Sequence, residues 1–203
     1  MGRIMRRILL GQELRQHKTV GCFLLLLAAI GAVGGFMVPS GLFGLSPLTL
    51  APHMDIYLRS LNYEQIRPAE EFWDFLSWNG GAALAMLIGG LYEAGPILSC
   101  GVLLVRSFSF AMVDFYLICA KASCGPALFL SVLIPQLLSL LVCLRVGVAA
   151  VSVSGWGRGG KYGDERERIV KLLLTLTVCL PDLILAALLQ ASLPRLVLRL
   201  AFG

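Results

Sequence analysis

The stretch Gly89-Gly-Leu-Tyr-Glu-Ala-Gly-Pro-Ile-Leu-Ser-Cys-Gly-Val-Leu-Leu-Val-Arg106 decides the fold class of this chain. It is apolar, yet it contains a carboxylate at Glu93, a helix-breaking residue at Pro96 and a cation at Arg106. Lipid can satisfy neither a broken helix nor a charge, so in a bilayer such groups need other protein segments around them. We therefore predict that this stretch lies inside a polytopic α-helical membrane protein.

The composition agrees with a membrane protein. Hydrophobic residues make up 58% of the chain and charged residues only 14%, whereas about one quarter of a soluble protein is charged. The 203 residues suffice for about five spans of roughly 20 residues each. The net charge of +5 is modest and does not indicate a nucleic-acid partner. We expect an all-α fold that forms a single membrane domain over residues 1–203.

The N-terminal part predicts a leader followed by a first span. The leader, residues 1–18, is basic and fits either an amphipathic helix on an anionic membrane surface or a positive flank that orients the next span. The uncharged residues 19–38 form the first span. Within it, Gly31 and Gly35 form a small-xxx-small face, which lets another helix of this chain or of a partner approach closely.

Residues 39–79 form the longest polar connection, in which we expect short interfacial helices. One lies near Tyr57, and another starts at Arg67 with Pro68 in its first turn. Tryptophans in the second are expected to mark the water–lipid boundary. The connection also supplies candidates for a partner contact, which are Tyr57, Asn62, Trp73, Phe75 and Trp78.

The second to fourth spans lie within residues 80–151 and allow two arrangements around the broken region Glu93–Pro96. In one, a single span covers residues 80–106 with a kink at Pro96. In the other, a short span ends near residue 92, and the broken region turns the chain into a third helix over residues 97–120. We favour the second arrangement, because it makes the third helix long enough to cross a bilayer.

The last part of the chain sets the topology. After a fourth span interrupted at Pro135-Gln136, a basic loop covers residues 152–171, a fifth span covers residues 172–193 and a tail covers residues 194–203. With five spans, the basic loop and the leader lie on the same side. The positive-inside rule places that side in the cytoplasm, together with the N-terminus, and leaves residues 39–79 outside. The tail then also lies outside, although it is basic.

Five ionisable residues are expected at membrane depth: Glu93, Arg106, Asp114, Arg145 and Asp182. Each costs at least roughly 2.5 kcal/mol when it faces lipid, so we expect a buried charge network. Three interpretations fit: pairs that fix helix packing, a proton or ion path, and side chains that snorkel near span ends. The pairing we favour joins Glu93 to Arg106 or to Arg145.

The sequence predicts no catalytic, cofactor or metal site. His17 and His53 lie on opposite sides of the membrane in this topology. The sequence lacks the H-E-x-x-H, G-x-S-x-G and Walker A motifs. The six cysteines form no C-x-x-C pair, and we interpret them as small apolar side chains. We therefore expect a protein that is not an enzyme.

An ordered set of motifs resembles the bacterial stage II sporulation protein M family. A basic leader precedes a glycine-rich first span, and Tyr57-Leu-Arg-Ser-Leu-Asn62 follows in the outer connection. Next come Gly95-Pro96 and the basic residue Arg106, and then Ile134-Pro-Gln-Leu-Leu138, which contains Pro135 and Gln136. The resemblance extends to about residue 150. The chain departs from the family pattern at Ser139 and its neighbours, where the family often has Asn.

The resemblance implies a non-enzymatic protein of the septal membrane that acts in engulfment during endospore formation. Its implied partners are stage II sporulation proteins D and P, which are membrane-tethered, degrade septal peptidoglycan and would be localised by this scaffold. The residues alone leave a second function class open. Broken helices and intramembrane charge also suit a transporter or permease-like subunit.

Overall fold

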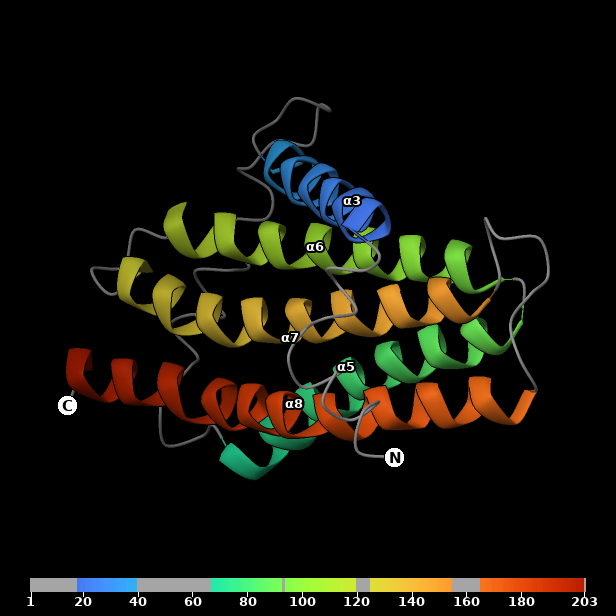
Figure 1. Cartoon of the computed structure of the whole chain (residues 1–203). Coiled ribbons are helices and arrows are strands. Elements are labelled where there is room, and N and C mark those ends of the chain that lie inside the picture. The colour runs from blue at the N-terminus through green and yellow to red at the C-terminus, as the bar shows by residue number, and fades with distance from the viewer. Residues whose placement is uncertain (1–17, 40–66, 93, 120–124, 155–164, 203) are drawn as a thin grey trace.

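The computed structural model describes residues 18–39, 67–92, 94–119, 125–154 and 165–202. These residues form five helices, which are α3 (Lys18–Met37), α5 (Pro68–Leu91), α6 (Gly95–Cys119), α7 (Gly125–Val153) and α8 (Glu165–Phe202). Figure 1 shows α6, α7 and α8 alongside one another, with α3 crossing α6 obliquely on the outside of the bundle. The described part of the chain is all-α, as the sequence predicts.

Four of these helices, α3, α6, α7 and α8, are long and apolar enough to cross a bilayer. Large apolar side chains that are more than half exposed lie on all four, for example Phe23, Val105, Leu130 and Leu173. Soluble proteins rarely expose so much apolar surface. This is the architecture of a multi-pass membrane protein, and the first predicted span, residues 19–38, agrees with α3 to within one residue at each end.

The broken region is a tight turn between two helices. Helix α5 ends at Leu91 and α6 begins at Gly95, so the second of the two predicted arrangements is the one observed. A Cβ atom on Gly95 would lie 2.9 Å from the Cα atom of Gly90 and 3.0 Å from the carbonyl oxygen of Gly89. Glycine is therefore required for the two helix ends to come this close. Pro96 occupies the first turn of α6, where its missing N–H costs nothing.

Helix α5 is longer than the sequence suggests. We predicted an interfacial helix from Arg67 and a separate span from residue 80, but a single helix continues through Gly80 and Gly81. Side chains on both sides of the glycines hold the helix together. Asn79 is buried and donates a hydrogen bond to the carbonyl oxygen of Phe75 at 2.8 Å, and Ala83 is fully buried.

Helix α8 also continues beyond its predicted end. The sequence predicts a span over residues 172–193 and a separate tail, whereas the observed helix runs to Phe202 with Pro181 and Pro194 inside it. Proline removes one backbone hydrogen bond, and neighbouring helices can compensate for that loss in a membrane protein. Buried residues on both sides of Pro194, namely Ala191 and Leu198, anchor this end of α8 to the bundle.

Helix α7 forms the centre of the bundle and packs against each of the other four helices. Its small side chains allow this close packing, because Val142, Cys143, Val146, Ala149 and Val153 are almost completely buried. Pro135 lies inside α7 without ending it. Larger side chains from the surrounding helices fill the core, among them Leu24, Met86, Leu103 and Leu183.

Candidate functional site

Arg106 is a cation buried within the bundle, and only 6% of its surface is exposed. Its position in α6 lies roughly 16 Å along the helix axis from Gly95, at 1.5 Å per residue. Its Nη2 atom donates a hydrogen bond to the backbone carbonyl of Trp78 on α5. The guanidinium carbon lies 5.3 Å from the ring centroid of Trp78 and 5.8 Å from that of Phe110, both within cation–π range.

No carboxylate neutralises Arg106 within the described part of the chain. The two ion pairs found there are Arg67–Glu70 and Arg145–Asp182. A guanidinium has five N–H donors and stays protonated, and the described residues offer it a single acceptor. In a bilayer crossed by α6, this leaves a positive charge near mid-depth that is stabilised by one carbonyl and two aromatic rings.

A groove of about 630 Å³ lies between α5 and α6 beside Arg106. Most of its lining is apolar, and its floor is built from small residues, with Gly81 and Ala82 on α5 and Gly101 on α6. A Cβ atom added to Gly81 or Gly101 would meet nothing within 4 Å. The groove therefore combines a shallow, unfilled floor with a cation that has one hydrogen-bond acceptor among the described residues.

Asp114 forms a second polar contact, with Gln136. Both residues are 5% exposed. With the Gln136 amide nitrogen turned toward Asp114, it donates to both carboxylate oxygens at 3.0 Å. This contact joins α6 to α7, and it gives the Pro135-Gln136 motif a structural role at the point where the sequence predicted an interruption.

Arg145 and Asp182 form the third contact, between α7 and α8. Nη1 of Arg145 lies 2.7 Å from Oδ2 of Asp182, and 44% of each side chain is exposed. An ion pair on a lipid-facing surface removes most of the cost that either charge would have alone. This pair therefore stabilises the packing of α8 against α7.

Four of the five charged residues predicted at membrane depth are described, and these four do not form one connected network with one another. Arg106, Asp114, and the Arg145–Asp182 pair each have their own partners. Among the described residues, the partner observed for Arg145 is Asp182 and the partner observed for Arg106 is the carbonyl of Trp78. Glu93 itself lies outside the described residues, and so does its predicted pairing.

Gly31 and Gly35 provide the close approach between α3 and α6. A Cβ atom on Gly31 would overlap the carbonyl oxygen of Leu104 and the hydroxyl of Ser107. A Cβ atom on Gly35 would overlap the carbonyl oxygen of Phe108. This face, which we proposed for helix packing or for a partner, is therefore occupied by α6 of the same chain.

The predicted aromatic contact residues are divided between two places on α5. Trp78 is 73% exposed and lies at the level of Arg106, so it is near mid-depth in a bilayer crossed by α6 and not at the boundary where we expected it. Trp73, also exposed, packs edge-on against Phe72 with 5.2 Å between ring centroids. Phe75 is half-buried. Tyr57 and Asn62 lie outside the described residues.

A second groove, which the sequence did not predict, lies between α5 and α8. Its volume is about 880 Å³, and Arg195 and Arg199 contribute to its lining. We had assigned these arginines to a separate tail. Their spacing of four residues, which places both on one face of a helix, was the available signal.

Comparison of this chain with known proteins found no matching family model, no matching curated protein and no matching solved structure.

Proposed function

We propose that this chain is a non-enzymatic membrane scaffold that binds the membrane anchors of other proteins. On the family resemblance of its motifs, those partners are the membrane-tethered wall hydrolases related to stage II sporulation proteins D and P, in the septal membrane of a sporulating bacterium. The single observation that supports a binding role is the buried Arg106, which has no carboxylate partner in the described chain and opens onto the α5–α6 groove.

The charge of Arg106 favours a partner with a hydrogen-bond acceptor. An unpaired cation at membrane depth is costly, and a carboxylate or carbonyl supplied by a second protein would lower that cost. Within hydrocarbon, Arg binds a carboxylate through two parallel N–H···O bonds. An occupant that presents an acidic or amide side chain at the level of Trp78 would therefore fit.

The floor of the groove favours a helix as the occupant. Membrane helices associate through small residues, because these let two backbones approach closely. Gly81, Ala82 and Gly101 provide such a surface, whereas the other glycine pair, Gly31 and Gly35, is already covered by α6. A tethered hydrolase must contribute a membrane anchor, and this groove is a surface on which such an anchor can pack.

Co-purification tests the proposal. The tagged full-length chain is co-expressed with tagged stage II sporulation proteins D and P and purified in mild detergent. Replacement of Gly101 by Leu adds bulk to the groove floor at a position where a Cβ atom meets nothing within 4 Å, and Arg106→Gln removes the charge. Arg106→Gln should reduce the recovered hydrolase at least roughly tenfold, as expected when one partner of a buried charged contact is removed. Gly101→Leu should also reduce it, because the added bulk prevents close approach of a partner helix.

A matched control separates groove filling from a general effect of added bulk. Ala29 on α3 is exposed and lies outside the groove lining, so Ala29→Leu should leave recovery unchanged. The amount of inserted protein is measured for every variant by fluorescence-detected size exclusion. Full hydrolase recovery with well-folded Gly101→Leu would contradict the proposed contact, and peptidoglycan cleavage by the purified chain alone would contradict the non-enzymatic role.

The transporter alternative depends on an intramembrane charged site that faces water. Asp182, one of the charged residues predicted at membrane depth, is paired with Arg145 and lines neither of the two grooves described above. Substrate-dependent transport by the purified chain in proteoliposomes would favour this alternative over the scaffold.

A further inference from the structure

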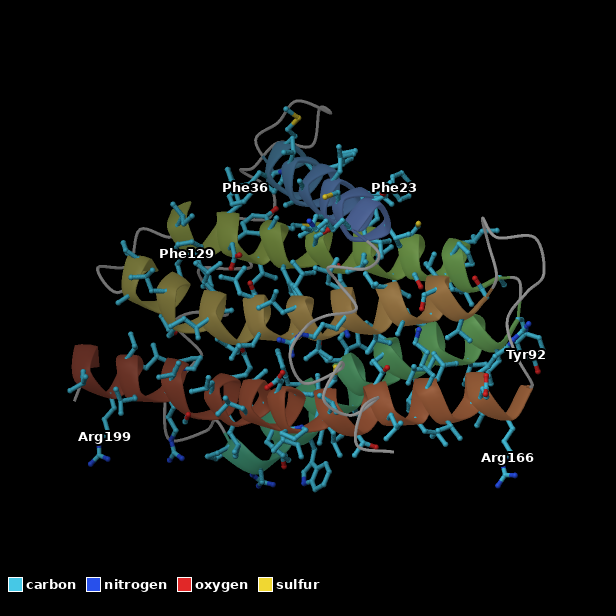
Figure 2. The ribbon with its side chains drawn as sticks, viewed as in Figure 1. Phe23, Phe36, Tyr92, Phe129, Arg166 and Arg199 are labelled. Atoms are coloured by element: carbon cyan, nitrogen blue, oxygen red, sulfur yellow. The ribbon has the colours of Figure 1, made fainter. Side chains whose placement is uncertain are left out.

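The groove between α5 and α8 lies where the first turns of α5 meet the last turns of α8. Its lining comes from Phe72 and Trp73 on α5 and from Leu188, Ala191, Arg195 and Arg199 on α8, among other residues. Figure 2 shows Arg199 near the C-terminal end of α8, at the end of the bundle opposite to Arg166. The positive-inside argument assigns this end to the outer side of the membrane.

Among the described residues that line the groove, the charged ones are both arginines. Arg195 and Arg199 lie one helical turn apart on the same face of α8, and neither has an ion pair with a described residue. The acidic residues in the first turns of α5 point elsewhere. At about 100° per residue, Glu70 and Asp74 lie on the opposite side of α5 from Phe72. Glu71 lies about a quarter turn from Phe72, and none of the three acids lines the groove.

Polar and apolar groups are separated along the groove. The arginines are near the end of α8, and the apolar residues Leu188 and Ala191 lie one to two turns deeper along the same helix. Phe72 and Trp73 line the same groove from α5. A phospholipid in the adjacent leaflet has the same arrangement, with its phosphate at the membrane surface and its acyl chains below.

We propose that this groove binds an anionic phospholipid of the outer leaflet. The phosphate accepts hydrogen bonds from the two guanidinium groups, since Arg binds phosphate oxygens through paired N–H donors. One acyl chain lies along Leu188, Ala191 and Phe72. The site is independent of the Arg106 groove and of the proposed scaffold function, and it accounts for a basic end of α8 on the side where the positive-inside rule expects few cations.

Trp73 provides a direct probe of the occupant. The double substitution Trp78→Phe and Trp156→Phe leaves Trp73 as the single tryptophan of the chain. The full-length protein is reconstituted into phosphatidylcholine bilayers that contain a small fraction of either dibrominated phosphatidylglycerol or dibrominated phosphatidylcholine. Quenching of Trp73 fluorescence then measures how strongly each lipid binds beside this residue.

Dibrominated phosphatidylglycerol should associate with the site on the order of tenfold more strongly than dibrominated phosphatidylcholine, because it has a net negative charge that two arginines attract. In phosphatidylcholine, the choline cation neutralises the phosphate. Replacing both Arg195 and Arg199 with Gln should bring the ratio close to one, and Arg199→Gln alone should give an intermediate value. The matched control is Arg166→Gln at the other end of α8, which should leave the ratio unchanged. Size exclusion verifies that each variant is folded.

Three outcomes would overturn the proposal. Equal quenching by the two lipids would mean that Trp73 contacts only non-specific surrounding lipid. A preference that survives the double arginine substitution, or that Arg166→Gln also abolishes, would mean that the groove does not supply it. Displacement of phosphatidylglycerol by inorganic phosphate, beyond the effect of potassium chloride at equal ionic strength, would identify a site for free anions instead.

Discussion

Arg145 and Asp182, which are 37 residues apart in the sequence, form an ion pair across the interface of α7 and α8 with 2.7 Å between Nη1 and Oδ2. Both α7 and α8 are long and apolar enough to cross a bilayer. Neither charge is stable alone at that depth, so the pair ties the insertion of α8 to its packing against α7.

Removing one member of this pair should reduce the amount of folded, inserted protein. Asp182→Ala leaves the Arg145 cation facing lipid, at a cost of about 2.5–3.5 kcal/mol on insertion scales. The double variant Arg145→Ala, Asp182→Ala removes both charges and should recover most of the loss. The measurement is the monodisperse peak in fluorescence-detected size exclusion. The exposed pair Arg67–Glu70 serves as control, because Arg67→Gln should have little effect. If the two single losses simply add in the double variant, the pair does not contribute as described.

Three neighbouring glycines in α3 should respond differently to the same substitution. Gly35→Ala places a methyl group against the carbonyl of Phe108 and should destabilise the protein by about 1–3 kcal/mol through overpacking. Gly31→Ala should behave similarly. Gly34→Ala is the matched control, because its Cβ would lie at an ordinary 3.5 Å from the ring of Phe108. Thermal unfolding in detergent measures the effect, and equal stability of all three variants would refute the close contact of α3 with α6.

The Asp114–Gln136 contact predicts a coupling between α6 and α7. Gln136→Leu leaves the buried Asp114 carboxyl without its donor and should cost about 1–3 kcal/mol. Asp114→Leu should have a similar cost, because it leaves the buried amide of Gln136 without its acceptor. The double variant should be more stable than the sum of the two losses predicts, because no unsatisfied group is left. A double-mutant cycle from thermal unfolding gives the coupling energy, and a value near zero would exclude the contact.

The directions of α6, α7 and α8 predict which residues share a side of the membrane. Figure 2 places Tyr92 and Arg166 at one end of the bundle and Phe129 and Arg199 at the other. We expect the first end to be cytoplasmic, from the positive-inside rule. In a background without native cysteines, Arg199→Cys should react with an impermeant maleimide in intact cells. Tyr92→Cys and Arg166→Cys should react only after permeabilisation. Reaction of Tyr92→Cys and Arg199→Cys from the same side would rule out the proposed crossing of α6.

The fold class, the position of the first span and the break before α6 follow from the sequence alone. These features depend on local properties, because a long apolar run seeks the bilayer core and Gly95-Pro96 ends one helix and starts another wherever it stands. For example, the predicted first span, residues 19–38, agrees closely with the observed helix α3, Lys18–Met37. Helix ends defined by weaker signals were predicted less well, as Gly80 and Pro194 show.

Which polar groups contact one another depends on how the helices pack. Arg145 could pair with any carboxylate at the same depth, and only the packing of α8 against α7 selects Asp182. The same holds for Arg106, whose acceptor is a backbone carbonyl of Trp78 on another helix and therefore has no side-chain signature in the sequence. Tertiary packing also keeps α5 and α8 continuous. The glycines of α5 and the prolines of α8 favour the end of a helix when only their sequence neighbours are considered. Buried side chains nearby, such as Asn79 and Leu198, stabilise the helix through these positions. Helical propensity is a property of a few consecutive residues, whereas a contact between helices depends on how all of them pack.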